Sequence, residues 1–261
     1  MSVLEALIHP SAVVSPRARI ASDVRIGPGA IIEENVEIAA GCVIGSCVLL
    51  GKGSRLQENI HVHHGAVIGS PPQDLKYAGE PTAAVIGRNT VIREYATVNR
   101  GTKERGETMV GENCLLMAYS HVAHDCVIGT DVILANAVNL AGHVEVDDYA
   151  IIGGVVPVHQ FVKIGKHAMI GGGYRVPQDV CPYSLVAGYP LKVAGLNVIG
   201  LRRRGFAVES IRALEAAFKL LFFSNLNTTQ AVERITAEVP STPETLDVLD
   251  FVGRSSRGMV K

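Results

Sequence analysis

The chain has 261 residues, a formal net charge of −1, a hydrophobic share of 48% and a charged share of 19%. This length allows one or two domains with a large core, and the near-zero charge argues against a nucleic-acid binder that depends on bulk positive charge. No run of 18 apolar residues occurs, and residues 1–11 lack the pattern of a secretory signal. We therefore expect a cytoplasmic protein that does not insert into a membrane.

A six-residue repeat runs from Ile8 to Val176. Aliphatic residues occupy nearly every sixth position: Ile8, Val14, Ile20, Ile26, Ile32, Ile38, Ile44, Leu50, Leu56, Val62 and Ile68, then Ile86, Ile92 and Val98, then Val110, Leu116, Val122, Ile128, Leu134, Leu140, Val146, Ile152, Val158, Ile164, Ile170 and Val176. No helix keeps such residues on one face, but a strand does if the chain turns regularly. The repeat therefore predicts a parallel β-helix, and these rung residues fill its interior.

Small residues and glycines accompany the rung residues. A small residue, such as Ala30 or Ala66, stands two positions before many of them, and we place it near a corner of the β-helix. Glycine often follows the rung residue directly, as at Gly27, Gly45 and Gly69. We predict that these glycines adopt the positive φ of a turn.

Five cysteines are present and none forms a CxxC motif. Cys42, Cys114 and Cys126 occupy the small corner position. We expect buried free thiols rather than disulfides or a zinc site, in agreement with a cytoplasmic protein.

Two segments interrupt the repeat. Residues 70–85 form a polar excursion in which Leu75 and Tyr77 are expected to anchor an ordered loop. Residues 100–109 are richer in charge and glycine, and we expect them to be mobile.

After Pro177 the period changes to that of helices. Helices are predicted over residues 208–223, from Thr228 or Thr229 to Glu238, and from Thr242 to about Gly253. We place a β-helix domain at 1–190, with excursions at 70–85 and 100–109, and a small helical domain at 191–261. The helices are expected to cover the open end of the sheets.

The repeat resembles that of the hexapeptide-repeat acyltransferases, whose coil is a left-handed triangular prism with three hexapeptides per turn. This resemblance implies a mainly β fold, a left-handed parallel β-helix followed by a C-terminal α-helical domain. It also implies that residues 18 positions apart stack on neighbouring coils.

Period 18 gathers one outward-facing polar patch. It stacks His124 with Gly142 and Gln160, Asp125 with His143, and His121 with Asn139, and His159 lies beside Gln160. Solvated or subunit-interface histidines would give the same pattern. The functional interpretation is acid–base catalysis, because imidazole titrates near neutral pH. The side chain that Gly142 lacks leaves room for a substrate carbonyl, and its backbone N–H could face an oxyanion.

Several segments together resemble the UDP-N-acetylglucosamine O-acyltransferase family, which starts lipid A synthesis. They are residues 118–126 (AYSHVAHDC), 72–77 (PQDLKY), 140–143 (LAGH), 158–161 (VHQF), 202–206 (RRRGF) and 254–258 (RSSRG). The similarity covers nearly the whole chain. Asn99 and Ile199 depart from the family pattern, which has His and Glu there.

The resemblance implies a role for each matching residue. His124 would be the general base, Asp125 its orienting partner and Gly142 the oxyanion donor. The substrate-binding residues would be Gln73, Asp74, Lys76, His121, His143, His159, Gln160, Gly172, Asn197, Arg203 and Arg204. Without the resemblance, three adjacent arginines at a helix start would be read as a solvated face.

The same resemblance implies the reaction and its partners. A (3R)-3-hydroxyacyl group would pass from the phosphopantetheine arm of acyl carrier protein to the glucosamine 3-hydroxyl of UDP-N-acetylglucosamine. No other cofactor and no metal would be needed. The family forms homotrimers with sites between subunits, so residues distant in the sequence can converge.

Asn136, Gly154 and Gly172 also lie 18 positions apart. The two glycines would leave a groove running along the coils away from His124, although both could instead serve turns. In the family the position of Gly172 resembles the end of the acyl groove, so we predict a preference for long 3-hydroxyacyl chains.

Three alternatives stay open. A γ-type carbonic-anhydrase-like metalloenzyme would use His121 and His124 with a neighbour's histidine as zinc ligands. A structural or ice-binding β-helix would show a regular outer face of threonines, whereas the outer positions here are irregular. A coenzyme-A-dependent acetyltransferase shares the fold, but the loop and the arginines argue against it.

Overall fold

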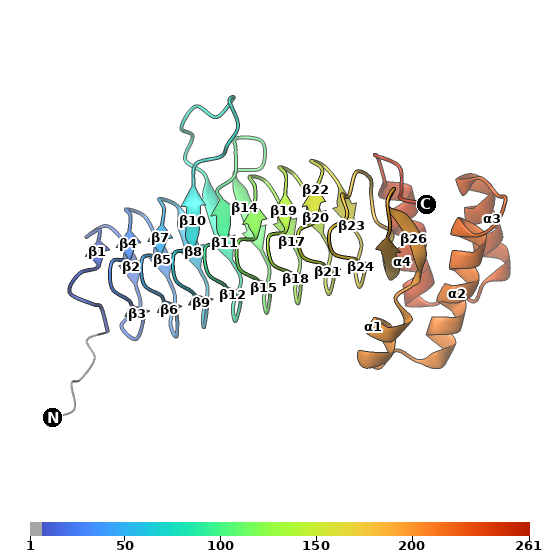
Figure 1. Cartoon of the computed structure of the whole chain (residues 1–261), viewed down its shortest axis with the longest axis horizontal. Helices are drawn as coiled ribbons and strands as arrows, with labels where there is room; N and C mark the ends of the chain where they lie inside the picture. Colours follow the sequence, from blue (N-terminus) through green and yellow to red (C-terminus); the bar gives the residue numbers. More distant parts are fainter. Residues whose placement is uncertain (1–6) are drawn as a thin grey trace.

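The computed structural model describes residues 7–261, so the first six residues of the predicted β-helix domain, and most of the stretch tested for a signal, lie outside the described residues. From residue 7 onward the chain coils into a long prism that ends in a cluster of helices (Figure 1). The strands form three sheets, which we call faces I, II and III. Pairing across neighbouring coils is parallel, and outside the excursions the offset between paired strands is 18 residues as far as residue 170, after which it shortens to 16.

Face I contains β1 (Val13–Val14), β4 (Ile31–Ile32), β7 (Leu49–Leu50), β10 (Val67–Ser70), β13 (Thr97–Asn99), β16 (His121–Val122), β19 (Asn139–Leu140) and β22 (Pro157–Val158). Face II contains β2 (Arg19–Ile20), β5 (Glu37–Ile38), β8 (Ser54–Leu56), β11 (Ala83–Ile86), β14 (Glu107–Val110), β17 (Val127–Ile128), β20 (Glu145–Val146) and β23 (Lys163–Ile164). Face III contains β3 (Arg25–Ile26), β6 (Val43–Ile44), β9 (His61–Val62), β12 (Val91–Ile92), β15 (Leu115–Leu116), β18 (Ile133–Leu134), β21 (Ile151–Ile152), β24 (Met169–Ile170), β25 (Ser184–Ala187) and β26 (Lys192–Leu196). We name the prism edges I/II, II/III and III/I after the faces that they join.

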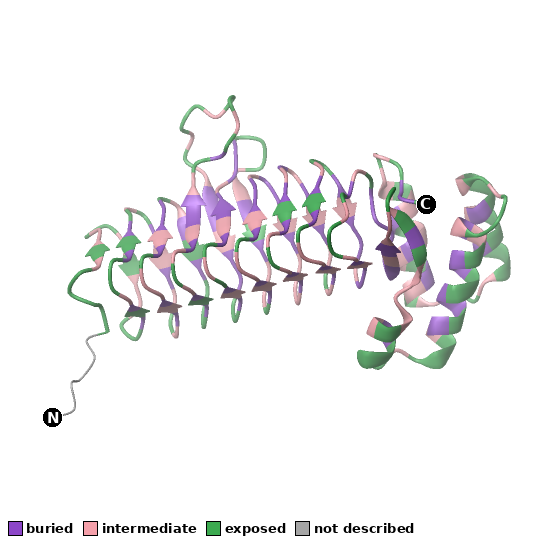
Figure 2. Ribbon diagram, viewed as in Figure 1, coloured by how far each residue is buried: buried purple, intermediate pink, exposed green. Residues whose placement is uncertain are grey.

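The rung residues fill the prism, as the repeat predicts. From Ile26 to Val176 every one of them is buried, and the strands alternate buried and more exposed positions (Figure 2). The small residues before them are buried as well, among them Cys42, Cys114 and Cys126. All five cysteines are free, and Cys47 is exposed.

The prediction for the glycines after the rung residues is wrong at most positions. Gly69 has φ +80°, but Gly27 and Gly45 do not adopt positive φ. A Cβ on Gly27 would lie 2.9 Å from the carbonyl carbon of Gly45, so stacking against the next coil excludes a side chain. Positive φ occurs three positions after the rung residue instead, including Asp125 (60°) and His143 (61°). Asp, Asn and His tolerate this conformation better than most residues.

Both excursions leave the prism at the I/II edge, where face I strands β10 and β13 connect to face II strands β11 and β14. Tyr77 anchors the first loop, because its hydroxyl accepts a hydrogen bond from Nε of Arg100 (2.9 Å). The expected second anchor is wrong, since Leu75 is fully exposed. The second excursion, which we expect to be mobile, is held at both ends. Residues 107–110 form β14, and Thr102 is buried and makes the hydrogen bonds described below.

The C-terminal part begins with an antiparallel pair that the sequence reading missed, β25 and β26, which extends face III as far as Leu196. Four helices follow: α1 (Val198–Arg203), α2 (Val208–Phe222), α3 (Thr228–Glu238) and α4 (Pro243–Arg254). The predicted helices over α2, α3 and α4 are confirmed. The cap of α3 is Asn227 rather than Thr228 or Thr229, because the Asn227 side chain accepts from the backbone N–H of Gln230.

The helices close the end of the prism. α2 packs against β26, α3 and α4, and it buries Ile211, Leu214, Phe218 and Leu221. Within residues 7–261 no helix combines the length and apolarity required to cross a lipid bilayer.

Candidate active site

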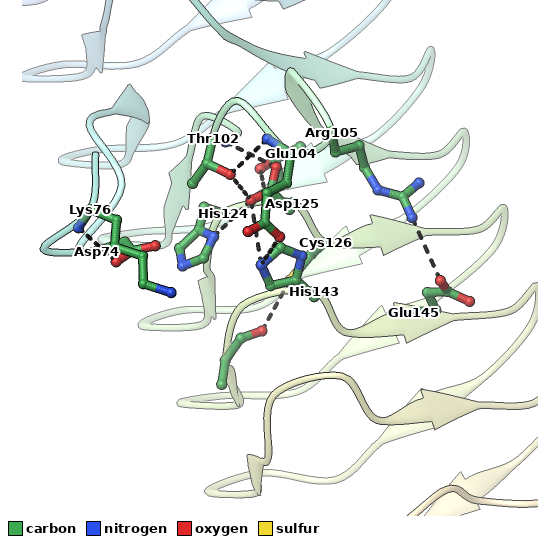
Figure 3. Close-up of polar contacts among 12 residues, drawn as sticks. Asp74, Lys76, Thr102, Glu104, Arg105, His124, Asp125, Cys126, His143 and Glu145 are labelled. Atoms are coloured by element: carbon green, nitrogen blue, oxygen red, sulfur yellow. Dashed lines mark hydrogen bonds and ion pairs between the residues drawn. The ribbon is translucent and has the colours of Figure 1, made fainter. Parts of the chain in front are cut away.

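His124 and Asp125 lie at the I/II edge, in the turn between β16 and β17 (Figure 3). The left-handed backbone of Asp125 directs its carboxylate toward its neighbour, and Oδ2 lies 2.8 Å from Nδ1 of His124. Asp125 is completely buried, whereas 14% of the His124 side chain is exposed. The pair therefore presents one imidazole at the surface, supported from behind by a buried acid.

Thr102 supplies most of the remaining contacts of the Asp125 carboxylate. The backbone N–H of Thr102 donates to Oδ1 (2.9 Å) and its hydroxyl to Oδ2 (2.7 Å). Burial alone would raise the pKa of Asp125, but the hydrogen bonds from His124 and Thr102 outweigh it and lower the pKa. An ionised Asp125 favours the His124 tautomer with its proton on Nδ1, which leaves Nε2 free to accept a proton.

Gly142 occupies the next coil directly above His124. A Cβ at this position would lie 2.6 Å from Cε1 and 2.8 Å from Nε2 of His124, so only glycine fits beside the imidazole. The Gly142 N–H donates to no acceptor within residues 7–261. The site thus combines an imidazole nitrogen with a free backbone donor, an arrangement that suits proton transfer beside a developing oxyanion.

His143 places a second imidazole close to the Asp125 carboxylate. Its Nε2 lies 3.7 Å from Oδ2 of Asp125 and 3.6 Å from a carboxylate oxygen of Glu104 in the second excursion. The ring contacts the His124 ring edge-on and stacks on Phe161. His124, Asp125 and His143 bring their ligand atoms within 4.8 Å of one another, a spacing that would also suit a metal ion.

The rest of the predicted patch follows the stacking of the coils. His121, on face I, lies 2.7 Å from the Thr97 hydroxyl through Nδ1. Burial lowers the pKa of His121, and the nearby His124 lowers it further. Gln160 and His159 are on the coil above Gly142.

The loop that carries Gln73, Asp74 and Lys76 leaves the same edge, between β10 and β11. Asp74 accepts a hydrogen bond from the backbone N–H of Lys76 (3.0 Å), while Gln73 and Lys76 are exposed. Asp74 and Lys76 lie on the His124 side of this edge (Figure 3).

Four predicted site residues lie elsewhere on the chain. Gly172 stacks on Gly154 as predicted, and a Cβ on Gly172 would lie 3.2 Å from the Gly154 carbonyl oxygen. This column follows β21 and β24 at the III/I edge, so the prediction that its groove leads away from His124 on one surface is wrong for a single chain.

Asn197 caps α1, and its side chain donates to the backbone oxygen of His167 (3.0 Å). The three arginines stand at the end of α1, not at a helix start as predicted. Arg204 lies 4.5 Å above the ring of Tyr149 at the II/III edge, and Arg203 is exposed.

Two departures from the family pattern have simple structural descriptions. Asn99 is buried and donates to the Ser70 hydroxyl (2.7 Å), which joins two neighbouring strands of face I. Ile199 is exposed in the first turn of α1.

Thr102 is the main site residue that the sequence reading missed. It is 23 positions from Asp125, so the excursion takes it out of the period of 18. Its only sequence signal is its place next to Arg100 and Gly101 at the start of an excursion.

Comparisons with known proteins give matches over nearly the whole chain. A family model described as "Udp N-acetylglucosamine O-acyltransferase; Domain 2" matches residues 179–260, and the "Bacterial transferase hexapeptide (six repeats)" model matches residues 17–52 and 107–142. The acyl-[acyl-carrier-protein]--UDP-N-acetylglucosamine O-acyltransferase of Thiobacillus denitrificans is 44% identical over 257 residues, which are 98% of this chain and 100% of that protein.

Solved structures also match the chain over nearly its whole length. LpxA from Acinetobacter baumannii has a TM-score of 0.95 and 42% identity, with 98% of this chain and 100% of that chain covered. LpxA from Bacteroides fragilis, a UDP-N-acetylglucosamine acyltransferase, has a TM-score of 0.96 and 42% identity over 97% and 99% of the two chains. The fold is thus the left-handed parallel β-helix with C-terminal helices. The chain belongs to the UDP-N-acetylglucosamine O-acyltransferase family.

Proposed function

We propose that this chain transfers a (3R)-3-hydroxyacyl group from acyl carrier protein to the glucosamine 3-hydroxyl of UDP-N-acetylglucosamine, the first step of lipid A biosynthesis. The names of its relatives supply the donor and the acceptor. The observation that carries the mechanism is the alignment of His124 between the buried Asp125 and the free N–H of Gly142.

The reaction needs one base and one oxyanion donor. Nε2 of His124 removes the proton of the 3-hydroxyl while the oxygen attacks the thioester carbonyl carbon. The Gly142 N–H donates to the oxyanion of the tetrahedral intermediate. The intermediate then collapses, the carbon–sulfur bond breaks, and the phosphopantetheine thiolate takes the proton from the His124 imidazolium. Asp125 stays ionised throughout and stabilises that imidazolium.

The remaining candidates bind the substrates. Asp74 and Lys76 meet the sugar and its phosphates, with Gln73 beside them, and an ammonium group suits a phosphate as a point charge. His121, His143, His159 and Gln160 hold sugar, nucleotide or acyl-chain groups around the reacting atoms. Asn197, Arg203 and Arg204 face the nucleotide diphosphate or the carrier protein, and Gly172 ends the acyl groove.

These candidates occupy three different edges of one prism, which supports a homotrimer in which an edge of one subunit meets another edge of its neighbour. We propose that the protein acts in the cytoplasm, which agrees with five free cysteines. It requires no metal and no cofactor besides the phosphopantetheine arm of the donor, and it binds neither nucleic acid nor membrane.

Mass spectrometry of the products tests the function. The wild-type protein is incubated with UDP-N-acetylglucosamine and a panel of thioester donors, which are 3-hydroxyacyl thioesters of acyl carrier protein and of coenzyme A together with acetyl-coenzyme A. A nucleotide sugar heavier by one 3-hydroxyacyl group is expected from the carrier-protein donors. Equal turnover of coenzyme-A acetyl donors would instead favour a coenzyme-A-dependent acetyltransferase.

Replacement of the base tests the mechanism in the same assay. His124→Ala is expected to lose about 10²- to 10⁴-fold in turnover, because no other group replaces the base. His9→Ala, an exposed histidine at the far end of the prism, is the control and should keep full activity. Near wild-type turnover of His124→Ala would refute the assignment, and light scattering of each variant measures whether the assembly is a trimer.

A further inference from the structure

The two excursions meet at the short segment 100–102, which contacts both halves of the proposed site. On one side Thr102 donates two hydrogen bonds to the Asp125 carboxylate. On the other side Arg100 donates from Nε to the Tyr77 hydroxyl (2.9 Å), and its guanidinium lies 5.5 Å from the centre of the Tyr77 ring. Two residues separated only by Gly101 thus connect the catalytic pair with the first loop.

The segment itself is held firmly by backbone contacts. The Arg100 N–H donates to the Ser70 oxygen and the Gly101 N–H to the Ala83 oxygen, both at 3.0 Å. A Cβ on Gly101 would lie 2.4 Å from the backbone nitrogen of Glu107, so the chain is packed too closely here for a side chain. Segment 100–102 therefore has little freedom to move away from Asp125 or from Tyr77.

Tyr77 transmits the position of this segment to the first loop. Its N–H donates to the Asp74 carbonyl oxygen (3.0 Å), which closes the turn that contains Asp74 and Lys76. Its hydroxyl also donates to the backbone carbonyl oxygen of Glu80 (2.8 Å), so the Tyr77 side chain joins the two sides of the loop. Lys76 and Leu75, in contrast, are exposed.

We propose that segment 100–102 is a positioning element for the acyl transfer. Thr102 orients Asp125, and Arg100 fixes the first loop through Tyr77. The proposal rests on the proposed function, because it assigns the loop to the nucleotide sugar and Asp125 to the base. In this proposal Arg100, Thr102 and Tyr77 do not contact a reacting atom, and each of them acts through another group.

The first experiment separates orientation of Asp125 from simple structural support. Thr102→Val removes the hydroxyl at nearly constant volume and keeps the backbone N–H, whereas Thr102→Ser keeps both donors. Thr102→Val is expected to lower kcat roughly 10- to 100-fold, as for loss of a hydrogen bond to a charged group, with both KM values changed less than twofold. Thr102→Ser should restore most of kcat, and Thr130→Val, in a turn of the II/III edge, should match the wild type.

The second experiment tests the link to the loop. Tyr77→Phe keeps the ring and removes the hydroxyl, and it is expected to raise KM for UDP-N-acetylglucosamine severalfold while kcat changes less than twofold. In the double variant with Lys76→Ala the two effects on KM should be far from additive, because Tyr77 acts through the same loop.

Each result decides one point. Wild-type kcat in Thr102→Val, or an equal loss in Thr102→Ser, would overturn the role of the threonine. An unchanged KM in Tyr77→Phe, or additive effects in the double variant, would overturn the link to the loop. Absence of an acylated nucleotide sugar among the wild-type products would refute the proposed function itself, which keeps the two failures distinguishable.

Discussion

Nδ1 of His124 lies 2.8 Å from Oδ2 of Asp125, and that carboxylate is completely buried. A buried acid with a lowered pKa stays ionised at neutral pH and holds the imidazole in one tautomer. Asp125→Asn presents an amide instead of a carboxylate, so the tautomer and the charge that stabilises the imidazolium are both lost.

Asp125→Asn is therefore expected to lower kcat by about 10²- to 10⁴-fold at saturating concentrations of both substrates. Asp131→Asn changes the same type of turn position, with φ 56°, on another edge and serves as the control. If Asp125→Asn retained half of the wild-type kcat, the acid would have no orienting role.

Gly142→Ala tests the close contact above the base. The added methyl group would lie 2.6 Å from Cε1 of His124, so the imidazole must move, whereas the backbone of Gly142 has no positive φ that would strain an alanine. A displacement of the imidazole by roughly 1 Å is expected to lower kcat about 100-fold. Gly253→Ala, which has open space around its Cβ, is the matched control, and a wild-type kcat in Gly142→Ala would show that the imidazole is not used in this position.

Chelation distinguishes acid–base catalysis from a metal centre. Asp125 already accepts hydrogen bonds from His124 and Thr102, and a metal ion in this cluster would have to displace the contact with Nδ1 of His124. We expect full turnover after exhaustive dialysis against a chelator, with elemental analysis of the dialysed protein. Stoichiometric zinc whose removal abolishes turnover would favour the carbonic-anhydrase-like alternative.

Gly172→Met tests the length of the acyl groove. Gly172 has no positive φ and its Cβ position is close only to the backbone of the preceding coil, so a longer side chain can be accommodated. Each methylene excluded from an apolar groove loses about 0.8 kcal/mol, so the variant should reject long chains by orders of magnitude and prefer chains several carbons shorter. A competition assay with mixed chain lengths measures this, and identical product distributions from wild type and variant would remove Gly172 from the groove.

His167 makes the fold sensitive to acid. It is stacked between Tyr149 and Tyr183, and burial lowers its pKa to about 4, with the positive charges of Arg204 and Lys166 contributing. The unfolded chain therefore binds the proton first, so stability is complete above pH ~6.5 and falls as the pH drops toward about 4. Over this pH range the free energy of unfolding falls by about 3 kcal/mol.

His167→Phe should reduce this loss, because phenylalanine keeps the stack and cannot take up a proton. Chemical unfolding at pH 7.5 and at pH 4.5, at one protein concentration, gives the comparison with the wild type. His9→Phe is the control for an exposed histidine, and an equal acid loss in wild type and His167→Phe would assign the effect to other groups.

The period of six predicted the β-helix and the residues that fill it. The coil of three hexapeptides, which the family resemblance implies, translates sequence spacing into neighbours in space, and this placed Gly142 above His124 and His143 beside Asp125. The 18-residue coil also separates Gly172 from His124, because their spacing is not a multiple of 18, so the predicted groove lies at another edge of the single chain. The helices α2 and α4 followed from their apolar spacing and, for α4, from the Thr242 cap.

Only the tertiary structure decided the contacts that break this period. Thr102 reaches Asp125, and Arg100 reaches Tyr77, because the excursions fold back on the edge they leave, and no regular spacing records where an inserted loop returns. The same holds for Arg204 over Tyr149, which depends on how α1 packs against the prism after an unpredicted antiparallel strand pair. Local repetition specifies a repeated scaffold, whereas the support of the base and of the loop depends on long-range packing between segments that share no period.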